Sequence, residues 1–389
     1  MKKTYKSLSA LALAGTMIFA TGISTFAAEE AQTGTTGANT AVLKKVIEVI
    51  NHDGYAYEPE ITYTYLLESG TAAGTVTDDN NLTVNYKAGD VSYLAAGDSA
   101  EKTAEFHSAD AVSGDTSSRD ITWTFDPEAF PSAGVYRYTI TETTSVNPAD
   151  IGIDRADAYD TEKFLDVYVQ NGAEGQEIYG LIVVDDEEQA VDEDSAKSEG
   201  WKVGDDLETY ETYNLTVTKQ ITGAGADMKA RFPFTISLQG KMDNANIATE
   251  GTGENISEFG LDADGNAAVT GLLGNETDIV IKGLPKTVTF SVSEENQTGE
   301  TYQATAEATN LTGAQLVSGS DLEGNAQLDV LTDGAVANAE GGAITVTVTN
   351  SLEAISPTGV VLRYAPYILI LAAGIVIFLV SRKRREKED

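Results

Sequence analysis

The sequence contains no cysteine, only two histidines and far fewer basic than acidic residues. A chain without cysteine can form neither a disulfide nor a zinc site with thiolate ligands. The formal net charge is −36 at neutral pH, with 61 acidic residues against 25 basic ones. A surface of this charge repels nucleic acid and anionic lipid, so we expect neither of them as a partner.

Motifs that carry catalysis or bind cofactors are also missing. The sequence has no glycine-rich phosphate loop and no nucleophile elbow. Residues 262–266 (DADGN) are similar to part of a calcium loop, but the twelfth position from Asp262 is Leu273 instead of glutamate, so a hairpin turn is predicted. We therefore expect no metal, no cofactor and no turnover enzyme.

The amino terminus has the pattern of a secretory signal. Three lysines lie within the first six residues, an apolar segment follows at 8–23, and small residues surround Ala27. This order predicts a signal peptide over 1–27 and a flexible lead over 28–40. An amino-terminal membrane anchor is the alternative. A secreted chain without disulfides needs another way to reinforce its fold.

The carboxyl terminus reads as an anchor. A motif at 355–359 ends in Pro357, Thr358 and Gly359, an apolar segment follows at 361–380, and a basic tail occupies 381–389. Such a segment predicts a transmembrane span held by a cytoplasmic positive cluster. The arrangement resembles the sorting signal of Gram-positive surface proteins, which a sortase cleaves between Thr and Gly. The commonest form places one residue between Pro and Thr, whereas here they are adjacent, as in a subset of pilins. A plain anchor helix is the alternative.

Between these ends, short runs of alternating apolar residues predict β-strands. Helical patterns are scarce, and the pattern that opens at Leu43 returns at Leu215, which indicates an internal repeat. We predict an all-β chain of two tandem Ig-like, CnaB-like antiparallel β-sandwiches, over 41–211 and 212–353. The strands expected from these patterns cover 43–49, 61–67, 120–125, 134–142, 164–169, 179–184, 213–221, 232–238, 284–294 and 344–350.

Three polar residues of the second repeat fall on the apolar face of their strands: Lys219, Glu294 and Asn350. Burial lowers the pKa of a lysine and raises that of a glutamate, so the two can coexist as amine and carboxylic acid. A neutral amine is a nucleophile, and a neutral acid can polarise an amide carbonyl and transfer protons. If the three side chains meet, the lysine can displace ammonia and form an isopeptide bond. An ordinary buried ion pair beside a satisfied asparagine is the alternative.

These residues carry a resemblance to the major shaft pilins of Gram-positive bacteria, which are built from pilin isopeptide-linkage domains. In the second repeat Lys219 ends Leu-Thr-Val-Thr-Lys, Glu294 ends Val-Ser-Glu, and Asn350 ends Thr-Val-Thr-Asn. The resemblance implies a Lys219 to Asn350 bond promoted by Glu294.

In the first repeat the match is incomplete. Lys45 fits the family lysine better than Lys44, and Glu142 fits the family glutamate. The expected asparagine position holds Glu208, and no asparagine lies between Trp201 and Tyr213. We expect a charged cluster without a cross-link here. Condensation of Lys45 with Glu208 or Asp206 is the alternative, while Asn214 lies too close to the second repeat.

The resemblance also suggests how subunits join. Similar segments of shaft pilins hold the lysine that accepts the threonine carbonyl of the next subunit, and Lys202 fits that role better than Lys197. The expected function is a structural subunit of a sortase-assembled pilus, anchored to peptidoglycan and supporting adhesion. The expected partners are a pilus-class sortase, identical subunits joined head-to-tail, peptidoglycan, minor pilins and host surface ligands. A singly anchored adhesin or a minor or basal pilin is the runner-up, and a wall-attached enzyme is disfavoured.

Overall fold

The computed structural model describes residues 39–51, 54–70, 75–77, 83–185, 200–201, 207–243, 245–312, 315–337 and 343–353, with four isolated residues of the C-terminal segment. The predicted signal peptide, sorting motif, basic tail and almost all of the predicted transmembrane segment lie outside these ranges, as do Lys197, Lys202 and Asp206. Within the described part of the chain, no helix has the length and apolarity needed to cross a bilayer.

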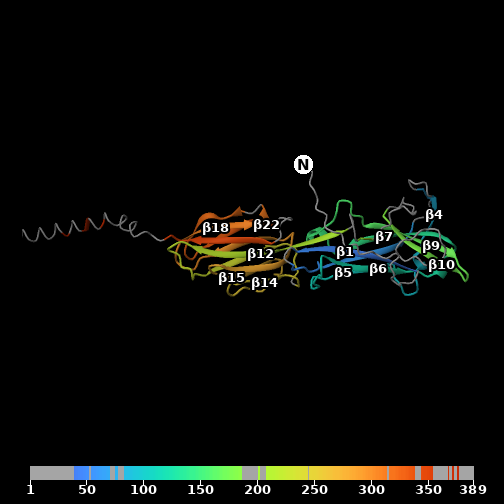
Figure 1. Ribbon diagram of the computed structural model, residues 1–389, viewed down its shortest axis with the longest axis horizontal. Coiled ribbons are helices and arrows are strands. Elements are labelled where there is room, and N and C mark those ends of the chain that lie inside the picture. Colours follow the sequence, from blue (N-terminus) through green and yellow to red (C-terminus); the bar gives the residue numbers. More distant parts are fainter. Residues whose placement is uncertain are drawn as a thin grey trace, which may run out of the picture. The chain divides into compact units, whose positions relative to one another are not determined.

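The chain divides into two compact units. Unit 1 comprises residues 1–213 together with 240–247 and 283–288, and unit 2 comprises 214–239, 248–282 and 289–389. Each unit is built of β-sheets (Figure 1). The predicted all-β class and its sandwich-like sheets are therefore confirmed.

One sheet of unit 1 is antiparallel along its main path. Its order is β10 (Gln176–Val184), β9 (Glu162–Asn171), β7 (Gly134–Thr144), β2 (Ile61–Ser69) and β5 (Glu101–Phe106); β4 (Thr83–Ala88) pairs parallel with β7 and antiparallel with β3 (Thr75–Thr77).

The second group of strands in unit 1 surrounds β1 (Thr40–Asn51). β6 (Thr116–Thr124) pairs antiparallel with β1, whereas β11 (Gly200–Trp201) and the start of β12 (Glu208–Thr222) pair parallel with it. The short β8 (Ile153–Asp154) pairs with β12. Short 3-10 turns lie at Val91–Tyr93, Pro127–Ala129 and Pro148–Ile151.

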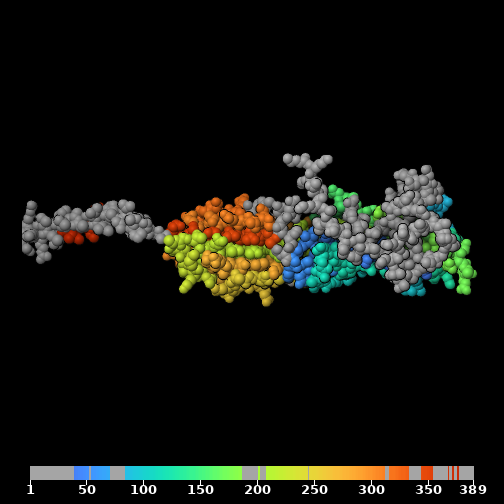
Figure 2. Space-filling model, in the orientation of Figure 1, coloured from blue at the N-terminus to red at the C-terminus, as the bar shows by residue number. Residues whose placement is uncertain are grey.

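Unit 2 repeats the two-sheet plan. One sheet has the order β15 (Ala267–Leu273), β13 (Phe232–Gln239), β17 (Thr289–Glu295) and β22 (Gln327–Ala337), with β19 (Leu311–Thr312) and β20 (Gln315–Leu316) beside β22. The other has the order β12, β23 (Ile344–Ser351), β18 (Tyr302–Thr309) and β21 (Ser318–Leu322), with β16 (Thr277–Pro285) beside β12 and β14 (Ala248–Glu250) beside β16. Figure 2 shows the red band of β23 along the yellow-green β12.

Alternating side chains explain why these strands bury one face. In β1 every second residue from Ala41 to Val49 is buried, including Lys45, while those between them are partly or fully exposed. One expected strand differs from the structure. The segment 284–294 contains a turn after Pro285, closed by the Val288 backbone N–H donating to the Pro285 carbonyl, and β17 begins only at Thr289. Val288 to Glu294 nevertheless keep the predicted alternation.

Candidate functional site

Three strands of unit 2 bring together the lysine, glutamate and asparagine expected from the sequence. Lys219 lies on β12 and Asn350 on the neighbouring parallel strand β23, where Asn350 pairs with Ile221. Glu294 lies on β17, in the other sheet of the unit. All three side chains point inward by strand alternation, and each residue has an exposed fraction of 0%. The site therefore lies in the core between the sheets.

The contacts in this site converge on one carboxylate oxygen. The Lys219 Nζ lies 2.8 Å from Glu294 Oε1, and Asn350 Nδ2 donates to the same oxygen at 2.7 Å. The Lys219 Nζ also lies 4.8 Å from the centre of the Phe232 ring. Among the described residues, the buried Glu294 Oε2 and Asn350 Oδ1 have no hydrogen-bond partner. Protonation of Glu294 would turn one of these unmatched acceptors into a donor.

Burial shifts both titratable groups of this site toward their uncharged forms. Desolvation lowers the pKa of Lys219 to about 8, although the Glu294 charge opposes the shift. Desolvation likewise raises the pKa of Glu294 above its ordinary value, against the opposing effects of Lys219 and Asn350. A neutral amine and a neutral acid are the states that amide exchange requires.

The arrangement can therefore form an amide without any added reagent. The Lys219 Nζ attacks the Asn350 Cγ, the bond from Cγ to Nδ2 breaks, and ammonia leaves. Glu294, which contacts both nitrogens, can take a proton from the amine and deliver one to the leaving nitrogen. A second carboxylate or a metal is not needed for this balance.

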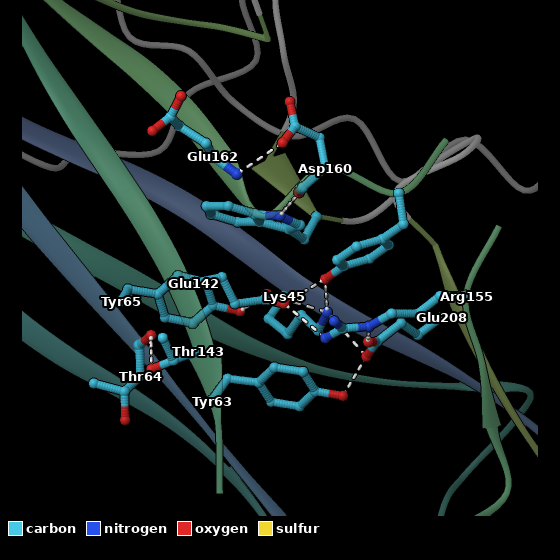
Figure 3. Close-up of polar contacts among 12 residues, drawn as sticks. Lys45, Tyr63, Thr64, Tyr65, Glu142, Thr143, Arg155, Asp160, Glu162 and Glu208 are labelled. Carbon is cyan, nitrogen blue, oxygen red and sulfur yellow. Dashed lines mark hydrogen bonds and ion pairs between the residues drawn. The ribbon is translucent and has the colours of Figure 1, made fainter. Parts of the chain in front are cut away.

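Unit 1 assembles a different cluster at the corresponding place (Figure 3). Lys45 on β1 is fully buried, and its Nζ lies 2.9 Å from Glu208 Oε2 and 3.4 Å from Glu142 Oε2. Lys44 instead extends to Asp120 on β6, at 2.6 Å, with a side chain 36% exposed. The structure thus places Lys45 rather than Lys44 in the core, beside Glu142 and Glu208.

Four further residues contact this cluster that the sequence patterns did not identify. Tyr63 and Tyr65 on β2 donate to Glu208 and Glu142, and Tyr159 donates to Glu142 at 2.7 Å. Arg155 contacts both carboxylates. The inward parity of the β2 tyrosines is visible in the sequence, but Arg155 and Tyr159 lie in an irregular segment without periodicity, so no sequence signal marks them.

The remaining predicted site residues are not brought together by the described structure. Lys202, Pro357, Thr358 and Gly359 lie outside the described residues. Their roles remain predictions. Asn214 belongs to unit 2.

Comparisons with known proteins link the chain to pilins. A family model described as a Spy0128-like isopeptide containing domain (FctA) matches residues 92–193, and one described as a domain of unknown function (DUF7601) matches residues 213–328. A pilin from Streptococcus pyogenes serotype M1 is 25% identical over 379 residues, covering 90% of this chain and 93% of the relative.

Solved structures of streptococcal pilins are also similar to the chain. The major pilin protein T3.2 from Streptococcus pyogenes matches with 22% identity and a TM-score of 0.45, covering 81% of this chain and 98% of its own. Another major pilin from Streptococcus pyogenes matches with 18% identity and a TM-score of 0.46, covering 82% and 100%. The family model over residues 92–193 and the pilin relative confirm the resemblance predicted from the sequence.

Proposed function

We propose that the chain is the shaft subunit of a covalently assembled cell-surface pilus. The observation that carries this proposal is the buried Lys219, Glu294 and Asn350 set of unit 2, in which Glu294 Oε1 lies within 2.8 Å of the lysine nitrogen and 2.7 Å of the amide nitrogen. An amide bond between Lys219 and Asn350 would join β12 to β23 and replace the disulfides that the chain lacks.

The cross-link suits a subunit that bears tension. The bonded Asn350 precedes the proposed sortase cleavage bond, Thr358 to Gly359, by a few residues. A force pulling on Thr358 would be borne by the covalent bond at Asn350. The hydrogen bonds of β23 would then not break one after another.

Assembly would join Thr358 of one subunit to Lys202 of the next. A pilus-class sortase would cleave after Thr358 and transfer its carbonyl to Lys202 of an identical subunit, or to peptidoglycan at the base. Repetition of this head-to-tail bond gives an open filament, because a heterologous contact need not close into a ring. The pilus would lie outside the cell and support adhesion together with minor pilins.

Immunoblots of wall extracts test assembly. Antibody against the chain should reveal a ladder of high-mass species in the parent strain, and Lys202→Ala should collapse the ladder to monomer. Lys197→Ala, a change of the neighbouring candidate lysine, is the matched control and should leave the ladder intact. A single band in the parent strain would instead favour the runner-up, a singly anchored adhesin or a minor or basal pilin.

A further inference from the structure

The two clusters share a backbone plan but differ in their polar shells. Tyr65 of β2 pairs with Glu142, and Phe234 of β13 pairs with Glu294, so these aromatic residues occupy corresponding positions. One alternation earlier, Tyr63 lies under Lys45 at 4.1 Å, as Phe232 lies under Lys219 at 4.8 Å. Unit 1 therefore has hydroxyl donors where unit 2 has apolar rings.

Donors saturate both carboxylates of unit 1. Glu142 accepts from Tyr159 at 2.7 Å and from Tyr65 at 2.8 Å, and Glu208 accepts from Tyr63. Lys45 contacts both acids, and no oxygen of either carboxylate is left without a partner in the described structure. The corresponding Glu294 keeps one unmatched oxygen. Burial raises the pKa of Glu142, as it does for Glu294, whereas Lys45 and the hydrogen bonds from Tyr159 and Tyr65 lower it. The donors around Glu142 therefore oppose the effect of burial and favour its ionised form.

Arg155 is the member of this shell that reaches both acids. β8 pairs with β12 so that Asp154 is opposite Thr209, which brings the next residue, Arg155, beside Glu208. The Arg155 Nε contacts Glu208 Oε1, and its Nη2 lies 2.9 Å from Glu142 Oε1. The central carbon of the Arg155 guanidinium lies over the Tyr159 ring, 4.2 Å from the ring centre, and the Arg155 side chain is 25% exposed.

A guanidinium constrains the acids in a way that tyrosine cannot. A hydroxyl group can reverse its role and accept a hydrogen bond from a carboxylic acid, whereas arginine has donors only and stays charged. A protonated Glu142 could still accept from Arg155 through its carbonyl oxygen, but it would lose the attraction between the two opposite charges. Unit 2 has no arginine among the contacts found for Glu294.

We propose that Arg155 favours the carboxylate form of Glu142 and so adds a second barrier to isopeptide chemistry in unit 1, beside the missing amide at position 208. This inference rests on the proposed bond in unit 2. It assigns the two units different modes of reinforcement: a reversible four-charge network of Lys45, Arg155, Glu142 and Glu208 in unit 1, and a permanent covalent bond in unit 2.

The pKa of Lys45 shows that Arg155 cannot oppose the reaction by acting on the lysine. Desolvation lowers the pKa of Lys45, both glutamates raise it, and Arg155 lowers it. Arg155 by itself thus favours a neutral, nucleophilic Lys45. Its effect against the reaction must act through the carboxylates that it binds.

The test restores an asparagine to unit 1 with and without the guanidinium. Glu208→Asn supplies the amide at the position that corresponds to Asn350. The double variant, Glu208→Asn with Arg155→Met, also removes the positive guanidinium that contacts Glu142. Peptide-mapping mass spectrometry of the purified ectodomain would measure a bond between Lys45 and position 208. We expect the double variant to form it about tenfold faster or more than Glu208→Asn alone, the factor set by losing a charge-assisted hydrogen bond.

Two controls keep the result specific. Glu208→Asn with Arg231→Met, which removes an arginine that contacts Glu254 in unit 2, should behave like Glu208→Asn alone. Adding Glu142→Gln to the double variant should abolish the new bond. Equal bond formation with and without Arg155, or none in the double variant, would overturn the inference. The Lys219 to Asn350 peptide in the same digest reports separately on unit 2.

A second measurement reads the charge of Glu142 directly in the wild-type protein. Carbon-13 NMR of glutamate-labelled wild-type ectodomain reports the charge of each buried carboxyl group through its chemical shift. Glu142, assigned by its loss in Glu142→Gln, should show the shift of a carboxylate at neutral pH. The shift of a protonated acid would contradict the role given to Arg155.

Discussion

Glu208 in unit 1 occupies the same place in the strand register as Asn350 in unit 2. Each lies on a strand parallel to the one that carries the lysine. Glu208 pairs with Ile47, which is two residues after Lys45, and Asn350 pairs with Ile221, which is two residues after Lys219. Each residue can thus approach its lysine from the same direction. The backbone places the reacting groups alike in both units. The units differ in the acyl group, which is a carboxylate in unit 1 and an amide in unit 2, and in the guanidinium of Arg155 beside Glu142.

Loss of the general acid in unit 2 should weaken the fold. Glu294→Gln should leave Lys219 and Asn350 unbonded. The unfolded chain then lacks a cross-link that closes a loop of more than a hundred residues. The chain-entropy model gives a loss of about 5 kcal/mol in the free energy of unfolding. Denaturant titration followed by far-ultraviolet circular dichroism measures this loss. Glu295→Gln, at the exposed neighbouring position, should leave stability unchanged. Equal stabilities for the two variants would contradict a covalent role for Glu294.

The free lysine of unit 2 should make stability depend on pH in the alkaline range. In Asn350→Ala no bond can form, and burial lowers the pKa of Lys219 to about 8 in the folded state, against an ordinary value of 10.5. Between these values the unfolded chain binds more protons than the folded one, so the free energy of unfolding should rise with pH.

Urea titrations of Asn350→Ala at pH 8.0 and 9.5 would detect this rise, since the interval lies below the ordinary ionisation of tyrosine. Asn350→Ala with Lys219→Met lacks the titrating amine and should show a smaller slope. The wild type should resemble this control because its Lys219 is consumed by the bond. A wild-type slope as steep as that of Asn350→Ala would show that the amine is still free.

A second buried ion pair in unit 1 should be costly to break. Arg137 on β7 and Asp166 on β9 form a bidentate contact, with Nε to Oδ1 at 2.7 Å and Nη2 to Oδ2 at 2.8 Å. Asp166→Asn leaves a buried guanidinium without its counter-charge, which typically costs about 3–5 kcal/mol. Asp120→Asn breaks the exposed pair with Lys44 and should cost about 1 kcal/mol or less. Thermal unfolding of both variants measures the difference, and similar losses would contradict this reading of burial.

The alternation of side chains along the strands accounts for most of the site residues that the sequence could predict. The parity that put Lys45, Glu142, Lys219, Glu294 and Asn350 on apolar faces agrees with their burial, since each residue has an exposed fraction of 5% or less. Parity works because side chains alternate strictly across a strand and only one face can enter the core. The strand boundaries were less predictable: a proline and a turn end β16 inside a run that alternation alone reads as continuous.

The shell around the unit 1 cluster could not be predicted in the same way. Tyr63 and Tyr65 were visible as inward-facing residues, but an inward tyrosine usually only fills a core. Arg155 follows a two-residue strand, and Tyr159 lies in a turn closed by its N–H donating to the Ala156 carbonyl. Their approach to Glu142 depends on long-range pairing of β8 with β12, which no local pattern encodes.

Peptide-mapping mass spectrometry of the mature wild-type ectodomain tests the central claim most directly. The account predicts that the peptides containing Lys219 and Asn350 are recovered as one branched species, lighter than their sum by one ammonia, while the peptide containing Lys45 is linear. Recovery of the Lys219 and Asn350 peptides as separate linear species, with an intact mass equal to that of the sequence, would contradict it.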